Sequence, residues 1–245
     1  MEMYKLELKK IRLSAYLWAV LGIFASLLAM GILFLFLGSS TSEKEELFAS
    51  WNGLAAMQTA LTVAFFSIFA AVLAAKMIVD EYCGKEVVLL FSYPVSRRRI
   101  LEQKAVILVG FTATAAFVSN LLIMGGMYLV AEMFGITPKL LEMQFYNRFI
   151  GGAYLSFVIS VVASSFMAGI LSSTIGVISA VAGWKKRSTM TTIICSFIIV
   201  CFVPNFIAGL PEHALLIMIL VSALFILAAY MMYQSLAKGI EEMEV

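Results

Sequence analysis

The chain has 245 residues, of which 62% are hydrophobic and only 13% charged, and its formal net charge is +2. Soluble domains are about a quarter charged and about half apolar, whereas apolar runs of about 18 residues or more recur along this chain. These numbers exclude a soluble globular fold. Lipid offers no partner to backbone polar groups outside a helix. We therefore expect an all-α integral membrane protein, with residues 1–245 forming a single transmembrane domain.

The first 15 residues form a basic amphipathic segment. Its apolar face consists of Tyr4, Leu8, Ile11 and Ala15. A neighbouring basic stripe consists of Lys5, Lys9 and Arg12. This pattern predicts an interfacial helix lying on the inner leaflet ahead of the first span. A simple electrostatic anchor is the alternative, and the two are compatible.

Six apolar segments follow in chain order. They cover residues 16–38, 53–79, 105–131, 149–184, 190–210 and 214–236. At about 1.5 Å per residue each can cross a hydrocarbon core of about 30 Å. The fourth segment is too long for one upright span and too short for two. We expect it to form a tilted helix projecting beyond the bilayer, or a short outer lead-in followed by the span.

Two of these segments carry further patterns. In the second, one helical face holds Gln58, Thr62, Phe65 and Phe69. This face could line a substrate cavity, but we favour a packed seam with Gln58 hydrogen-bonded to a neighbour. In the fourth, every fourth residue from 152 to 180 is small, which predicts close helix packing, with a sliding or hinge role as the alternative.

The basic residues divide unequally between the two sides that six spans define. One side has 14 of the 17 Lys and Arg residues, and the other has only Lys44, Lys139 and Arg148. The positive-inside rule then places both termini in the cytoplasm. We expect a multi-pass protein of a bacterial plasma membrane.

The chain lacks the residues that several classes of function require. No charge falls in the middle of an expected span, which argues against a self-sufficient ion-coupled transporter. The chain has no phosphate-binding loop, no HExxH motif and no metal-ligand spacing, and its three cysteines form no disulfide framework. The single histidine, His213, lies in a short outer turn. We expect no enzyme activity, no metal site and no nucleic-acid partner, so energy for transport must come from another chain.

The loop of residues 80–104 joins the second and third spans. An apolar patch at residues 87–91 precedes the turn Tyr93-Pro94-Val95-Ser96, three arginines and Lys104. A short cytoplasmic helix with an apolar face either lies on lipid headgroups or docks into a protein groove. The arginines suit anionic lipids in the first case and acidic side chains in the second.

This stretch resembles the loop of ABC-2-type transporter permeases. Their pattern of an acidic residue, a glycine, a leucine-rich helix, a Pro-Val-Ser-Arg-like turn and a lysine is matched by Glu81, Gly84, Leu89, Leu90, Pro94, Val95, Ser96, Arg97 and Lys104. Lys85 stands where the family often has threonine. The length, the six spans and the N-terminal amphipathic segment agree as well.

The resemblance implies a cytoplasmic coupling helix between spans two and three that docks on a separate ATP-binding subunit. The implied docking residues are Glu81, Gly84, Lys85, Glu86, Leu89, Leu90, Phe91, Pro94, Arg97 and Arg98, with Lys185 and Lys186 as a secondary contact. ATP and Mg would be bound by that partner, and this chain would hold no cofactor. A second permease would complete the transporter. We expect it to be a second copy of this chain, with a different permease as the alternative.

The function expected on this basis is ATP-driven export of an apolar or amphipathic substrate, such as a peptide toxin, an antimicrobial peptide or a lipid. The alternative is a non-transporting immunity or scaffold subunit of the membrane.

Overall fold

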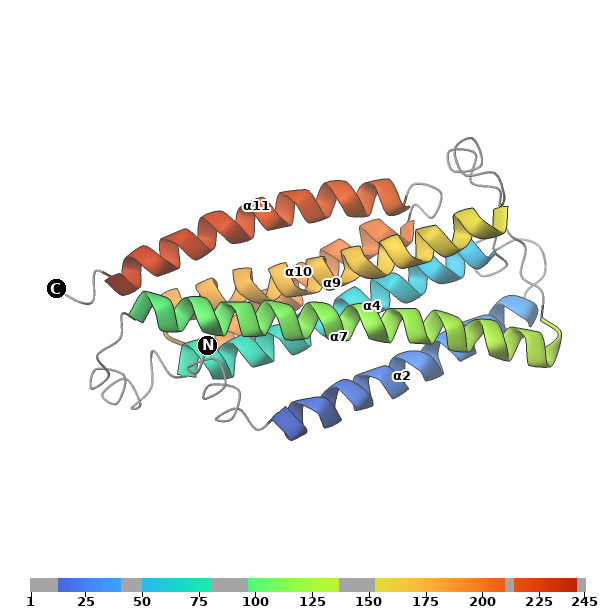
Figure 1. The fold of residues 1–245 in the computed structure, drawn as a ribbon, viewed down its shortest axis with the longest axis horizontal. Coiled ribbons are helices and arrows are strands. Elements are labelled where there is room, and N and C mark those ends of the chain that lie inside the picture. The colour runs from blue at the N-terminus through green and yellow to red at the C-terminus, as the bar shows by residue number, and fades with distance from the viewer. Residues whose placement is uncertain (1–12, 41–49, 81–96, 137–152, 210–213, 242–245) are drawn as a thin grey trace.

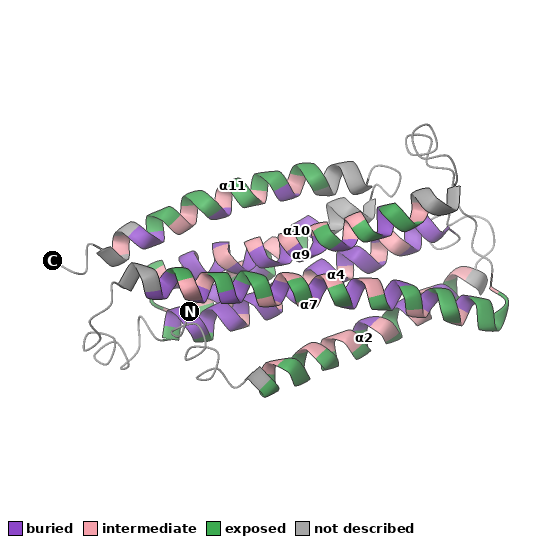
Figure 2. Cartoon of the chain, in the orientation of Figure 1, coloured by how far each residue is buried: buried purple, intermediate pink, exposed green. Residues whose placement is uncertain are grey.

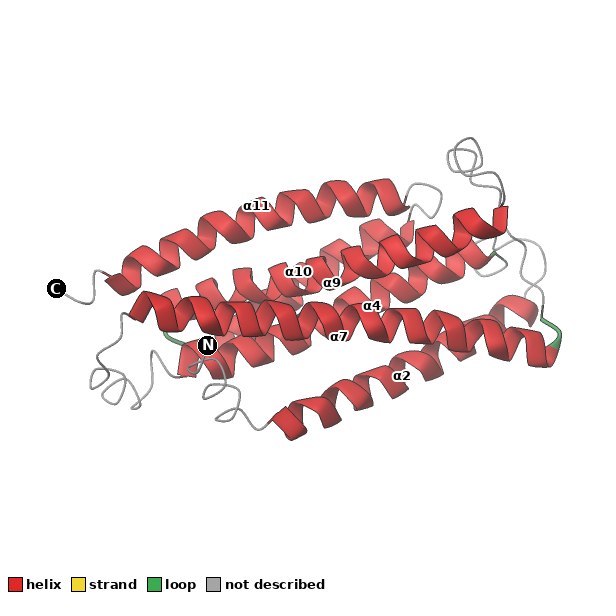
Figure 3. Ribbon diagram, viewed as in Figure 1, coloured by secondary structure: helices red, strands yellow, loops and turns green. Residues whose placement is uncertain are grey.

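The computed structural model describes residues 13–40, 50–80, 97–136, 153–209 and 214–241. These residues form six α-helices and one π-helical turn (Figure 3). In chain order they are α2 (Leu13–Ser40), α4 (Trp51–Ala74), the π turn η1 (Ala75–Val79), α7 (Arg97–Phe134), α9 (Ala153–Lys185), α10 (Thr189–Gly209) and α11 (Ala214–Glu241). The expectation of an all-α chain is confirmed, and six helices are present in these ranges, five of which are long and apolar enough to cross a membrane. The predicted N-terminal interfacial helix and residues 81–96 of the predicted coupling loop lie outside the described residues.

Consecutive helices run in opposite directions along one elongated bundle (Figure 1). η1, the start of α7, the α9–α10 connection and the end of α11 all lie at its left-hand end in this view. We call this the basic end. All nine Lys and Arg residues of the described ranges belong to these segments: Lys76, Arg97, Arg98, Arg99, Lys104, Lys185, Lys186, Arg187 and Lys238.

Length and hydropathy identify this as a multi-pass membrane protein. Within the described ranges five helical stretches can cross a bilayer: Ser14–Gly38, Trp51–Val79, Ile100–Phe134, Phe157–Lys185 and Ile219–Ala237. A sixth apolar stretch, Thr189–Val203 in α10, is shorter.

The two longest helices extend far beyond a hydrocarbon core of about 30 Å. α7 has 38 residues and α9 has 33, so they extend for about 57 and about 50 Å. α7 begins at Arg97, ahead of the residue 105 at which the third apolar segment starts. The three arginines therefore form the first turn of a helix rather than a loop. Arg, Leu, Glu, Gln and Lys, which make up seven of the eight residues 97–104, all favour helix.

The central helix of the bundle is α9, which packs on α4, α7, α10 and α11. Small residues allow this. A side chain at Gly169 would place its Cβ 2.6 Å from the Ala113 carbonyl oxygen of α7, and one at Gly176 would come 2.6 Å from the Ala70 Cβ of α4. The close packing predicted from the every-fourth small residues is thus observed at Gly176, and Gly169, which lies outside that series, adds a second close approach.

By contrast, α2 lies at the edge of the bundle, and only α4 and α7 hold it closely. Its buried residues form one stripe, Leu27, Gly31 and Leu35. Buried residues are dense on α4 and α9, whereas α2 and α11 expose long outward faces (Figure 2). Those faces are apolar, as a helix surface in contact with lipid must be.

Candidate functional site

The α9–α10 connection gives the basic end a tightly defined turn. Arg187 has a φ of 49°, its N–H donates to the Trp184 carbonyl at 3.0 Å, and the Ser188 N–H donates to the Gly183 carbonyl at 3.0 Å. This is the Schellman arrangement that ends many helices, with arginine at the position that usually holds glycine. Lys185, Lys186 and Arg187 are all exposed on this turn.

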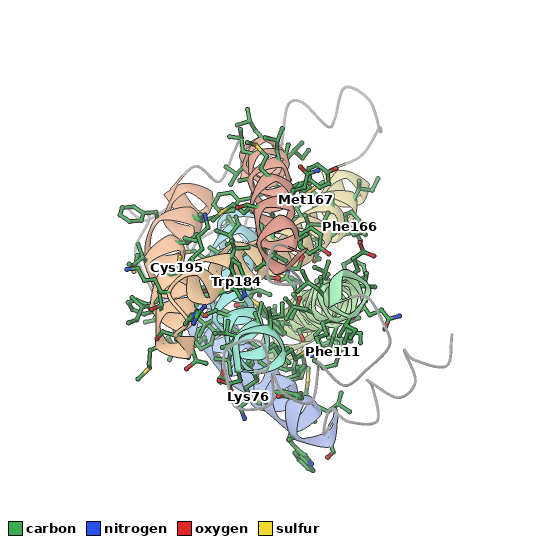
Figure 4. The ribbon with its side chains drawn as sticks, turned by 90° about the vertical axis from the view of Figure 1, so that its left-hand side faces the viewer. Lys76, Phe111, Phe166, Met167, Trp184 and Cys195 are labelled. Carbon is green, nitrogen blue, oxygen red and sulfur yellow. The ribbon has the colours of Figure 1, made fainter. Side chains whose placement is uncertain are left out.

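Two close contacts brace the turn against its neighbours. Gly183 lies so close to the Thr192 hydroxyl of α10 that a side chain at Gly183 could not fit. A Cβ at Gly239 of α11 would come 2.5 Å from the Trp184 ring. Figure 4 looks at the molecule from this end and labels Trp184 and Lys76. The three exposed cations are therefore carried by a connection that α10 and α11 both support.

The segments that flank residues 81–96 also lie at the basic end. η1 continues α4 as a π turn that buries Ala75, Met77, Ile78 and Val79 but exposes Lys76. On the other side, α7 begins at Arg97, and its Lys104 is only 1% exposed. The lysine of the permease-like pattern is therefore a buried residue, packed within the helix bundle.

The predicted docking residues divide into three groups. Those from Glu81 to Pro94 lie outside the described residues. Arg97 and Arg98 are the first two residues of α7, and Lys185 and Lys186 are exposed in the α9–α10 connection. The structure brings these last two pairs to the same end of the bundle (Figure 1). Their docking role stays a prediction.

The predicted polar and aromatic face of α4 divides as well. Gln58 and Thr62 are fully buried and Phe69 is 7% exposed, whereas Phe65 is 39% exposed. The four residues therefore do not share one environment. The choice between a seam and a cavity lining stays a prediction.

A polar cluster lies beside Thr62, and the sequence pattern of no single segment predicted it. Asn120 of α7 donates from Nδ2 to the Ser165 hydroxyl of α9 at 2.9 Å and to the Thr59 hydroxyl of α4 at 3.4 Å. Its Oδ1 accepts from the Thr62 hydroxyl at 2.9 Å. Thr59 and Ser165 direct their own protons to carbonyls of their own helices, at 2.7 Å each. The Thr62 hydroxyl oxygen also lies 2.9 Å from the Gln58 carbonyl of its own helix, so its one proton serves two acceptors at the same distance. The amide of Asn120 thus joins three helices through both its Nδ2 protons and its Oδ1.

The sequence held one signal for this cluster, since Asn120 is the only asparagine of its apolar segment. Polar residues at this depth often hydrogen-bond between helices. Among the described residues, no three His, Cys, Asp or Glu side chains come together as metal ligands would. The chemistry of the described bundle is that of hydroxyls and amides within, and of cations at one end.

Comparison with known proteins assigns the chain to a family. Residues 3–202 match the model of the ABC-2 family transporter protein. The chain belongs to this family. Its members are the membrane permeases of ABC-2-type transporters, which are non-catalytic transmembrane subunits and work with ATP-binding subunits. The resemblance drawn from the loop is confirmed, and the protein is the membrane component of such a transporter.

One curated relative is the Bacillus subtilis (strain 168) protein "Uncharacterized protein YcbO". It is 26% identical to this chain over 208 residues, which are 84% of each protein. The match therefore extends over most of both chains. No solved structure matches this chain.

Proposed function

We propose that this permease exports an apolar or amphipathic molecule, and that the basic end docks an ATP-binding subunit in the cytoplasm of a bacterium. The observation that carries the proposal is the gathering of all nine described cations at one end of the bundle. Positive charge at one end fixes orientation by the positive-inside rule, and the same end holds both helices that flank residues 81–96.

The proposed coupling is mechanical. ATP and Mg bind to the partner subunit, and closure of two such subunits pushes on residues 81–97 of two permease copies. Because η1 ends just before this segment and α7 begins at Arg97, a push is passed directly to two long helices. The braced turn at Lys185 to Arg187 supplies a second, rigid contact for the partner.

Apolar or amphipathic cargo fits the interior of the described bundle. Between its ends the described helices hold hydroxyl and amide side chains but no charged ones. A path for a charged cargo normally carries ionisable residues within the membrane. Peptides with apolar faces and lipids are therefore the proposed substrate classes.

The test is purification of the complex from native membranes, with the permease wild-type or as Leu90→Glu. An ATP-binding subunit should co-purify with the wild-type protein and be lost from Leu90→Glu, because a carboxylate cannot enter an apolar docking groove without a partner. Leu90→Met is the matched control and should retain the subunit. If wild-type protein brings down no ATP-binding subunit, the proposal fails. Full biological function with the partner's ATP hydrolysis blocked would favour the scaffold alternative.

A further inference from the structure

The attachment of α2 to the rest of the bundle runs along one seam of buried residues, and partly buried side chains as far back as Tyr16 also pack on the core. Leu27, Gly31 and Leu35 are the buried residues of the seam, and Leu28, Phe24 and Phe34 pack beside them. In a membrane, an apolar helix face gains little free energy when it moves from lipid onto another helix, because lipid tails are as apolar as leucine. What holds α2 is therefore close packing and hydrogen bonding at this seam.

The centre of the seam is Gly31. A Cβ placed there would lie 2.8 Å from the Met127 sulfur of α7 and 3.0 Å from Gln58 Oε1 of α4. Gln58 and Met127 are both fully buried. The nearest atoms that a side chain at Gly31 would meet thus belong to two flexible side chains.

Gln58 holds α2 by a weak bond. Its Nε2 donates to the Leu27 carbonyl at 3.4 Å, which is long for this kind of bond. Its Oε1 is buried and accepts from no donor among the described residues. A buried acceptor without a donor raises the free energy of the state that contains it. The closed seam is therefore destabilised at the residue that fastens it.

We propose that α2 separates from α4 and α7 along this seam during the transport cycle, and that the unpaired acceptor of Gln58 sets how readily it does so. The inference rests on the proposed function, since the ATP-binding partner supplies the work. Separation removes one long hydrogen bond and gives Gln58 Oε1 access to a donor, either water or a polar group of an amphipathic cargo. The α4–α7–α9 core keeps its bonds throughout.

The experiment is a cross-link across the seam. In a chain with Cys83, Cys195 and Cys201 replaced by alanine, Gly31→Cys and Met127→Cys place two thiols in contact, since the Cγ of Met127 lies 3.3 Å from the Cβ position of Gly31. The complex with its ATP-binding subunit is oxidised in native membranes, either free of nucleotide or trapped with ATP and vanadate. We expect efficient cross-linking without nucleotide and at least a fivefold lower yield after trapping.

Equal yields in the two states, in a complex that hydrolyses ATP, would overturn the inference, and so would failure to cross-link in either state. The absence of an ATP-binding subunit is a separate result that removes the proposed function itself. The two failures are therefore distinguishable.

A second variant tests the role of Gln58 in this separation. Gln58→Leu removes the unpaired acceptor, so we expect the trapped complex to retain most of its cross-link. Gly22→Ala, on α2 with no atom within 4 Å of the added methyl group, is the control and should leave both yields unchanged. If the cross-linking yield of Gln58→Leu falls after trapping as much as that of the parent chain, Gln58 does not control the separation of α2.

Discussion

Two buried amides, Asn120 and Gln58, lie near each other in the bundle but bind their neighbours very differently. Asn120 uses all its hydrogen-bonding atoms to join α4, α7 and α9, with its closest bonds at 2.9 Å. Gln58 reaches α2 with one bond of 3.4 Å and leaves Oε1 unpaired among the described residues. The difference separates a fixed three-helix core from a helix that is only loosely attached.

The glycines of the two regions repeat this contrast. Gly169 and Gly176 of α9 face backbone and a Cβ atom, which cannot move without moving a helix. Gly31 of α2 faces the ends of the Met127 and Gln58 side chains, which can change rotamer. We therefore expect the core to resist any added volume and the α2 seam to tolerate a small amount.

The largest effect should come from enlarging a core glycine. Gly169→Leu should lower the free energy of unfolding by about 3 kcal/mol or prevent folding, because a side chain there collides with the α7 backbone. Titration with SDS from mixed micelles, followed by circular dichroism, measures this. Gly110→Leu is the control, since no atom lies within 4 Å of a Cβ at Gly110. Equal losses in both variants would contradict the packing described for α9.

The two amides should differ next. Asn120→Leu should cost about 1–2 kcal/mol, because hydrogen bonds between membrane helices contribute about 0.6 kcal/mol each and at most about 1.7. Gln58→Leu should change stability by less than about 0.5 kcal/mol, since a weak bond and an unsatisfied acceptor are removed together. The same SDS titration compares them. A Gln58→Leu loss as large as that of Asn120→Leu would remove the distinction between core and seam.

A smaller effect than that of Asn120→Leu, and of opposite sign, concerns the braced turn at the basic end. Arg187→Gly should stabilise the fold by about 0.5–1 kcal/mol, because glycine adopts a positive φ without the clash that a side chain meets. Lys186→Gly also removes one cation but at a position without positive φ, so it should not stabilise. Thermal unfolding in detergent distinguishes the two variants. A lower melting temperature for Arg187→Gly than for Lys186→Gly would contradict the turn geometry.

The sequence predicted the helix content because each apolar run is bounded by charges or turn residues. It missed the start of α7, since the helix preference of residues 97–104 extends the helix beyond the apolar run. It could not pair Asn120 with Ser165 and Thr62, which lie 45 and 58 residues away in the chain, because one segment's pattern does not specify its neighbours. Phe65 and Phe69 share a face in the sequence. A four-residue step nevertheless turns the helix about 40° beyond a full turn, enough to leave Phe65 more exposed.

The central claim is that residues 81–96 dock an ATP-binding subunit at the basic end, and site-specific photo-cross-linking tests it most directly. A benzophenone amino acid would replace Leu90 in one variant and Leu129 in another, since Leu129 is 62% exposed near the far end of α7. The account predicts an ultraviolet-dependent adduct with the ATP-binding subunit from position 90 and none from position 129. An adduct only with lipid or with the permease itself at position 90, in membranes that contain the ATP-binding subunit, would contradict it.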